Sequence, residues 1–519
     1  MKVNAKIRKG AFNMNSQYKQ RWWVLASLAF GILAVGLDMT ILNLALPILS
    51  KDIHATNVEL QWFANGYNLV FAALLLPMGM LGDKVGRKKM LLVGLFTFGL
   101  ASLACAYAVS PWQLITARAF LGLGASMIVP LSMAVIPVMF TEKERPKAIA
   151  VWMMANAVGI PLGPILGGWL LNNFWWGSVF IINLPLVIVA LMAVSFLLPE
   201  SRSEEKRPID LPGVLISSTG LVALTYGVIK AGERGWSDVF SLTSVLAGIL
   251  LLTCFVVYQN RATHPLVDSS LFRSRSFAGG TLVGSIISFA LFGVLFALPQ
   301  YLQAVLEVDA QSAGLRLLPL VIGLLIATPI SDALQSRFGT RTAIVIGSVL
   351  LGIGLAMGST TDISTGYGFT SIWISAVGLG IGFALPAAMD EAISALTPER
   401  SGVGSALLMT MRQVGGTLGV AILGAVLNAG YRNNLILNEW PAEAAEVAQR
   451  NVSAGMAVAR QVGSDSLVHS VKTSFIGGMS NMLWVCVGAA VVGIIFTAGL
   501  LKARPVESRN STTSLEAKE

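Results

Sequence analysis

Charged residues are scarce in this chain. Asp, Glu, Lys and Arg make up 12% of its 519 residues, while hydrophobic residues make up 55%; a soluble domain carries roughly 25% charged residues. The shortage extends along the whole chain, which excludes an ordinary soluble domain and indicates that lipid surrounds most of it. The formal net charge of +9 does not indicate nucleic-acid binding, because the basic residues lie in short loops between apolar segments.

Cysteine and histidine are also rare, with three residues of each. Cys105, Cys254 and Cys486 lie inside apolar runs without CxxC or Cys/His spacing, so the sequence predicts neither disulfides nor a metal site. The histidines lie at or between the ends of the apolar segments, which argues against a polytopic membrane enzyme such as an acyltransferase. No GxxxxGK[ST] motif occurs, which argues against direct use of ATP, and we expect no cofactor.

Long apolar segments recur along the chain instead. A helix that spans a bilayer needs about 20 mostly apolar residues, and these segments are too long and too uniformly apolar for the strands of a β-barrel. The sequence therefore predicts an all-α polytopic membrane protein with fourteen spans. The predicted spans are 23–47, 58–81, 90–109, 112–139, 148–171, 178–198, 211–230, 239–259, 277–303, 313–334, 342–359, 370–396, 403–428 and 474–501.

The basic residues indicate how these spans are oriented. Most Lys and Arg residues fall in both tails and in alternate loops, on one side of the predicted spans. Because positive loops face the cytoplasm, we expect a protein of the inner (cytoplasmic) membrane with both termini in the cytoplasm. The segment 438–473 then lies outside, either as a solvated connector or as a small helical cap over the exit, because long loops are often functional.

A faint internal repeat divides the chain into halves. The sequence GMLGDKVGRKKML (79–91) follows the second span, and PISDALQSRFGTR (329–341) follows the tenth. Two six-helix bundles plus two inserted helices account for fourteen spans, and repeats of this type place a substrate site between the halves. The expected regions are a first bundle at 1–200, a linker with two inserted spans at 201–265, a second bundle at 266–505 and a tail at 506–519.

Four motifs together resemble one family of transporters. They are LDMTILNLALP (37–47), the GMLGDKVGRKKML loop, LITARAFLGLG (114–124) and GIPLGPILGG (159–168). The chain resembles the major facilitator superfamily, specifically the fourteen-helix drug:proton antiporter branch that includes quaternary-ammonium and multidrug exporters. The resemblance implies the major facilitator fold and proton-coupled export of lipophilic, cationic compounds by alternating access. We expect the chain to act as a monomer within the bilayer.

The loop motif resembles a gating element. Gly79 and Gly86 allow a tight turn there, and Asp83 can cap a helix or pair with a cation, with Arg87 close by in sequence. The resemblance implies gating by these four residues, and a simple helix cap is the alternative for Asp83.

The motif GIPLGPILGG resembles the antiporter signature of exporters. Its small residues let helices approach closely, and its proline permits a kink. The residues that the resemblance assigns to this motif are Gly159, Gly163, Pro164, Gly167 and Gly168.

Ionisable residues within the predicted spans are few and are functional candidates, because a charge in the bilayer is costly. Asp38 in the first span and Arg118 in the fourth both lie roughly 9–13 Å below the same end, at a rise of ~1.5 Å per residue. A carboxylic acid removed from water holds its proton more tightly. We therefore expect Asp38 and Arg118 to couple transport to protons, and Asp38 to bind a cationic substrate; a static ion pair is the alternative.

A second acidic site lies in the twelfth span. Asp390 and Glu391 differ by about 100° around the helix, so at most one of them faces a central cavity squarely. We expect Asp390 to face it and to bind protons and substrate. Glu391 either contributes to proton coupling or reaches toward the headgroups, and Arg412 on the next span is a candidate partner for one of the two.

Aromatic and Met side chains in the predicted cavity helices can hold a lipophilic cation, and ordinary packing is the alternative for each. The candidates are Trp62, Tyr67, Met127, Trp152, Phe289, Phe292, Tyr301 and Met409. Two other transport functions stay open, namely export of one endogenous metabolite, peptide or lipid-like molecule, and proton-coupled import, although GIPLGPILGG favours export. A polytopic membrane enzyme is the more distant alternative.

Overall fold

The computed structural model describes residues 2–140, 144–202, 210–262, 265–267, 269–396, 401–436, 440 and 442–501, and this part of the chain contains helices and no strand. The first helices are α1 (Lys2–Asp52), α2 (Asn57–Val85), α3 (Arg87–Ala106), α4 (Pro111–Met139), α5 (Arg145–Asn173), α6 (Ser178–Ile181), α7 (Asn183–Leu197), α8 (Leu211–Arg234) and α9 (Val239–Gln259). The 3-10 turn η1 (Ser269–Arg273), α10 (Arg275–Gln300), the π turn η2 (Tyr301–Val305), α11 (Ala310–Arg316), α12 (Leu318–Phe338), α13 (Thr340–Ser359), α14 (Tyr367–Ser394), α15 (Ser401–Asn434), α16 (Ala442–Ala448), α17 (Val452–Val462) and α18 (Asp465–Leu500) follow.

The helices confirm the predicted all-α polytopic fold. Thirteen helical stretches in the described part of the chain are long and apolar enough to cross a membrane, and each coincides with a predicted span. The remaining predicted span, 148–171, falls within α5, several of whose side chains lie outside the described residues. The last span begins earlier than predicted, at Asp465, because Ser464 caps α18 there. The predicted tail 506–519 lies outside the described residues.

Polar side chains determine where several spans begin. Thr56 accepts a hydrogen bond from the backbone N–H of Glu59, and the Glu59 carboxylate accepts one from the backbone N–H of Thr56, at the start of α2. Asp210, Asp238 and Ser274 cap α8, α9 and α10 by accepting from the amide three residues further on. These caps pair amides that a helix leaves without intrahelical partners at its N-terminus, so each apolar helix begins at a defined residue.

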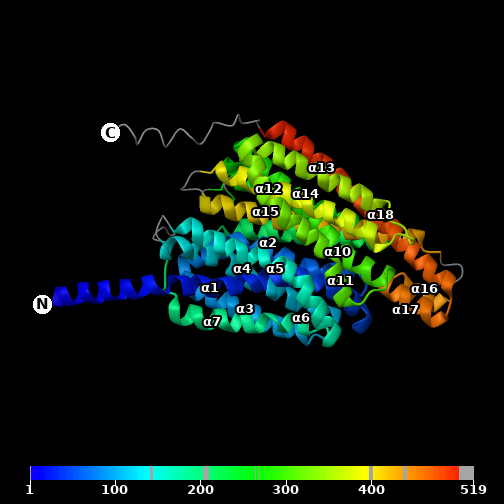
Figure 1. Ribbon diagram of the computed structural model, residues 1–519, viewed down its shortest axis with the longest axis horizontal. Helices are drawn as coiled ribbons and strands as arrows, with labels where there is room; N and C mark the ends of the chain where they lie inside the picture. Colours follow the sequence, from blue (N-terminus) through cyan, green and yellow to red (C-terminus); the bar gives the residue numbers. More distant parts are fainter. Residues whose placement is uncertain are drawn as a thin grey trace.

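The spans form two bundles with an inserted helix pair. Helices α1–α7 pack together, with α1 on α5 and α2 on α4, and α10–α15 pack with α18. In Figure 1 the first bundle (blue through cyan to blue-green) lies mostly below the second (green to red). The inserted helices α8 and α9 pack on each other, and α8 also packs against α2 of the first bundle and α15 of the second. Helix α8 of the inserted pair therefore covers the seam between the bundles.

An apolar cluster holds α8 at that seam. Val228 and Ile229 of α8 are buried together with Val58 of α2 and with Ala421 and Ala425 of α15. Burial of such side chains is the main driving force of packing in water, but in lipid close van der Waals contact takes its place. The small alanines of α15 let α8 approach the second bundle closely.

Two short helices lie within the predicted connector 438–473, and α18 begins before its end. We call α16 and α17 the cap helices, and the end of the molecule where they lie, opposite the N-terminus in Figure 1, the cap end. The side chain of buried Asn451 caps α17 and accepts a hydrogen bond from Ser50 at 2.9 Å. It also donates to the carbonyl oxygen of Ala55 at 2.7 Å. Of the two interpretations of this segment, the structure thus agrees with a helical one, joined to the first bundle.

An ion cluster joins the same helices to the second bundle. Arg460 of α17 and Lys472 of α18 each contact the carboxylate of Glu307, which follows η2, at 2.6 Å. The hydrogen bond from Lys472, together with the positive charges of both residues, holds the pKa of Glu307 below its usual value. The cap helices are therefore attached to both bundles.

Candidate functional site

The centre of the first bundle holds a buried ion pair. Asp38 lies within α1 and is 0% exposed, and Arg118 on α4 is 2% exposed. The Nη1 of Arg118 donates to Oδ2 of Asp38 at 2.6 Å. The structure therefore brings together the two ionisable residues that the sequence places at similar depth in the first and fourth spans.

Three further groups fix this pair. The Nε of Arg118 donates to the carbonyl oxygen of Phe63 at 2.9 Å, and its Cζ lies 4.6 Å from the centre of the Tyr67 ring. Asn183 of α7 donates to Oδ1 of Asp38 at 3.4 Å. A buried pair of this kind adds little net stability, but removal of one partner costs about 3–5 kcal/mol because a charge is left unpaired. The state of one carboxyl group can thus change contacts among four helices, α1, α2, α4 and α7.

Glycines of the GIPLGPILGG motif face α1 next to Asp38. A Cβ atom added at Gly159 would lie 3.0 Å from the backbone nitrogen of Leu37, and one added at Gly163 would lie 3.0 Å from Cβ of Thr40. Both distances are shorter than ordinary van der Waals contact. The glycines therefore permit α5 to pack directly on the segment of α1 that carries the carboxylate.

The same motif also reaches the second bundle. Gly167 packs on α1 like the preceding glycines, whereas a Cβ at Gly168 would lie 2.8 Å from the carbonyl oxygen of Ala310 in α11. The carbonyl group of Pro164 in turn lies against Gly314 of α11. Helix α5 thus connects the surroundings of the buried pair with the second bundle through close backbone contacts.

The predicted gating loop joins α2 and α3. The Nε of Arg87 donates to Oδ1 of Asp83 at 2.8 Å, four residues earlier. Gly86 has a backbone φ of +131°, which residues other than glycine rarely adopt. A Cβ atom there would also lie 2.6 Å from the carboxylate of Glu200. Gly79 packs on α4. The described contacts of Asp83 therefore lie within its own loop.

Replacement of Asp83 with asparagine is expected to impair transport with little loss of folded protein. The Asp83 side chain is 41% exposed, and an exposed ion pair contributes only about 0.2–1 kcal/mol, so a large loss of transport would reflect gating. Efflux per folded transporter measures the effect. Lys84→Gln, which neutralises an exposed charge in the same turn, is the control. Wild-type efflux by Asp83→Asn would identify Asp83 as a simple structural residue.

The second acidic site is divided between two environments. Asp390 is exposed, while Glu391 is buried and accepts a hydrogen bond from the hydroxyl group of Thr340 at the start of α13. The Nη1 of Arg412 lies 3.2 Å from the sulfur of Met389. Among the described residues Arg412 forms no salt bridge, so the structure places it against sulfur atoms and not against the acidic pair.

All the predicted aromatic and Met side chains except Trp62 belong to, or pack against, the main hydrophobic core, and their nearest neighbours differ. Tyr67 stacks on Arg118, and the sulfur of Met409 lies 3.8 Å from Nη1 of Arg412. The others have different neighbours: Trp62 lies beside Tyr226 of α8, Met127 against α3, Trp152 is hydrogen-bonded to Ser132, Phe289 and Phe292 lie against α15, and Tyr301 is buried in η2. Tyr67 and Met409 are thus the two that lie beside an arginine of the predicted sites.

Comparison with known protein families gives one match across the chain. Residues 28–420, which contain the buried pair, the loop and the glycine motif, match the family described as the Major Facilitator Superfamily. The chain belongs to that superfamily. As a member of the major facilitator superfamily it is a multi-pass membrane transporter and not an enzyme.

Three named relatives agree with the assignment to this superfamily. The chain is 32% identical to the "Tetracenomycin C resistance and export protein" of Streptomyces glaucescens, over 94% of this chain and 93% of that protein. It is 31% identical to the "Multidrug efflux pump LfrA" of Mycolicibacterium smegmatis, over 92% and 96%. It is 33% identical to the "Methyl viologen resistance protein SmvA" of Salmonella typhimurium, over 85% and 89%.

The fold is also that of a known transporter. The crystal structure of a bacterial homologue of the human lysosomal transporter Spinster superposes with a TM-score of 0.64, at 16% sequence identity, covering 94% of this chain and 99% of that chain. At this identity the likeness concerns the major facilitator fold alone.

A row of buried amide side chains on α2 is not among the site residues predicted from the sequence. Asn57, Gln61, Asn65 and Asn68 recur every three or four residues along α2, hence on one face, and all are buried. Asn57 and Asn68 are hydrogen-bonded to side-chain amides of α15 at 2.9 and 2.7 Å. The side chains of Gln61 and Asn65 have no hydrogen-bond partner among the described residues. The helical spacing of amides within an apolar span is the signal that could have revealed this polar face between the bundles.

Proposed function

We propose that this transporter exports lipophilic, cationic compounds in exchange for protons across the cell membrane. The observation that carries the proposal is the Asp38–Arg118 pair, fully buried within two spans of the first bundle. An ionisable pair in a membrane span is costly and is a functional candidate. It also belongs to a network that includes α2 and α7, so a change in its charge affects how these helices pack.

The pair offers a direct route to coupling. Protonation of Asp38 removes the negative charge that attracts Arg118, while Phe63 and Tyr67 still hold the guanidinium on the α2 side. The carboxylic acid and the arginine are then free to separate when the bundles move. Loss of the proton restores the attraction, and the two states of the pair thereby favour two arrangements of the helices.

The names of the relatives support the choice of substrate. One is named for export of tetracenomycin C, one for multidrug efflux and one for resistance to methyl viologen. Sequence identity of 31–33% with these proteins supports export of drug-like compounds, with a cation such as methyl viologen among the substrates to be tested. Tyr67 and Met409 are proposed contacts for such compounds, and Asp390 and Glu391 are proposed additional groups for protons or positive charge.

Contacts between the bundles support alternating access. Besides Asn451, which links the cap helices to Ser50 of α1, Gln303 donates to the carbonyl oxygen of Leu44 at 2.9 Å near the cap end. The bond between Asn68 and Gln413 lies further along α2. We propose that these bonds close the outer side of the transporter and break when the substrate is released outward.

Transport by purified protein in liposomes tests the proposed function. With an imposed pH gradient as the sole driving force, a labelled cationic drug is expected to accumulate against its own gradient, and proton movement is expected to follow addition of the drug. Drug accumulation that is insensitive to the pH gradient would reject proton coupling. Transport restricted to one metabolite, peptide or lipid-like molecule in a panel of cationic, zwitterionic and anionic compounds would reject the multidrug assignment.

The proposed orientation places both termini in the cytoplasm and the cap helices outside. In a variant without the three native cysteines, Glu446→Cys on α16 is expected to react with a membrane-impermeant maleimide in intact cells. Glu446 suits this purpose because its side chain is 81% exposed. Lys84→Cys, exposed in the last turn of α2, is expected to react only after permeabilisation. The reverse pattern would reject this orientation.

A further inference from the structure

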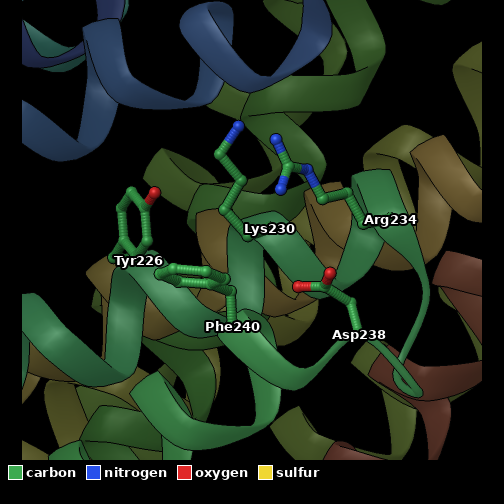
Figure 2. A pocket seen from close by; sticks show the side chains of 5 residues that line it. All are labelled: Tyr226, Lys230, Arg234, Asp238 and Phe240. Atoms are coloured by element: carbon green, nitrogen blue, oxygen red, sulfur yellow. The ribbon is translucent and has the colours of Figure 1, made fainter.

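A small pocket lies where the two inserted helices meet. It has a volume of about 130 Å³ and is lined by Tyr226, Lys230, Arg234, Asp238 and Phe240. The first three lie four residues apart on α8 and hence on one face of the helix. Figure 2 shows the cationic ends of Lys230 and Arg234 pointing the same way, with the carboxylate of Asp238 and the two rings nearby.

The pocket lies at the end of two spans, beside exposed aromatic residues. Lys230 and Arg234 lie in the last two turns of α8, and Gly235, with φ +91°, ends the helix beside them. Trp236 in the following turn is 59% exposed, and Phe240 in the first turn of α9 is 72% exposed. Exposed aromatic residues at the ends of spans lie at the membrane–water interface. The basic groups therefore lie where the phosphates of the adjoining leaflet are found.

The size and charge of the pocket restrict its occupant. Its volume of about 130 Å³ is well below the about 300–1,000 Å³ of pockets that bind drugs. Lys230 and Arg234 outnumber Asp238, so the lining carries net positive charge and would repel a cationic drug. One oxygen of Asp238 already accepts hydrogen bonds from the backbone and hydroxyl groups of Ser241. A single phosphate group matches both the volume and the charge.

We propose that this pocket binds the phosphate of an anionic glycerophospholipid in the leaflet at the cap end. Lys230 and Arg234 would hold the phosphate oxygens by charge-assisted hydrogen bonds. The acyl chains would then lie along the exposed apolar surface of α9, where Val239 and Phe240 are each 72% exposed. Because α8 packs against α2 and α15, the lipid would be bound at the helix that covers the seam between the bundles. This site is independent of the substrate and of proton coupling.

Lipid retention by the intact protein tests the proposal. The transporter is reconstituted in nanodiscs with equal amounts of phosphatidylglycerol and phosphatidylcholine, released into detergent, and analysed by native mass spectrometry. Wild-type protein is expected to retain phosphatidylglycerol preferentially. In Lys230→Gln/Arg234→Gln we expect the affinity for this lipid to fall roughly tenfold or more, since each basic group near an anionic surface contributes to attraction. No preference in the wild type, or an unchanged preference in the double variant, would overturn the proposal.

Two further variants separate charge from structure. Lys230→Arg/Arg234→Lys keeps both charges and is expected to keep the lipid. Asp238→Asn is expected to increase retention, because it removes the negative charge while asparagine still caps α9. Weaker retention in Asp238→Asn with an unchanged melting temperature would contradict the electrostatic assignment. Binding of inorganic phosphate that the double variant loses, together with unchanged phosphatidylglycerol retention in that variant, would identify a soluble-anion site and reject the lipid.

Discussion

Replacement of Asp38 with asparagine is expected to abolish drug efflux driven by a pH gradient while the protein still folds and reaches the membrane. Asparagine has nearly the size of aspartate, and its side-chain oxygen can still accept the hydrogen bond that Arg118 donates at 2.6 Å. It cannot bind or release a proton at neutral pH. The measurement is uphill transport by purified protein in liposomes with an imposed pH gradient. We expect the rate to fall to that of liposomes without protein.

Loss of stability must be separated from loss of coupling in this variant. Removal of one charge from a buried pair costs about 3–5 kcal/mol when the other is left unpaired, so the melting temperature is measured alongside transport. Ser102→Ala is a suitable control, because Ser102 contacts Asn183 in the same network at 3.3 Å but has no titratable group in the transport range. Uphill transport by Asp38→Asn at the wild-type rate would make Asp38 structural and direct attention to Asp390 and Glu391.

Substitution of Gly163 by leucine is expected to abolish transport as well, for a steric reason. Even a Cβ atom at this position would lie 3.0 Å from Cβ of Thr40 in α1, beside Asp38, so a leucine side chain must push α5 away from α1. Excess volume in a packed site typically costs about 1–3 kcal/mol, which a membrane protein can tolerate without unfolding. Drug efflux and the amount of folded protein in the membrane are measured together.

A glycine with free space around it provides the matched control. Nothing lies within 4 Å of a Cβ placed at Gly488 in α18, so Gly488→Leu makes the same chemical change in a span without displacing a neighbour. We expect Gly488→Leu to transport at the wild-type rate. If Gly163→Leu transported equally well, the close packing of α5 on α1 would not be required for the cycle.

Much of the fold could be predicted from the sequence because a bilayer imposes simple rules on each span. Thirteen predicted spans coincide with apolar helices in the described residues, since a crossing helix must be long, apolar and internally hydrogen-bonded. The acidic and basic members of the buried pair could also be recognised. Asp38 and Arg118 are ionisable residues in otherwise apolar segments, and counting residues along each helix places them at similar depth.

Contacts between helices could not be predicted in the same way. Asn451 joins Ser50 across most of the chain, and nothing in either local sequence indicates this partner. Trp62, a predicted substrate contact, lies beside Tyr226 of the inserted helix α8, a neighbour that neither local sequence indicates. Such contacts depend on how each helix is rotated and where it crosses its neighbours, and helices of similar apolarity leave that choice open.

The sequence by itself determined the helical class, the position of the spans and the few residues that carry charge within them, because these depend on hydropathy and length. Only the tertiary structure decided which face of each helix is used. Glu391 is buried against Thr340 while its neighbour Asp390 is exposed, and the lining of the small pocket comes from both α8 and α9. In a membrane the hydrophobic effect does not select the inward face of a helix, so close packing of small residues and pairing of polar groups make that selection.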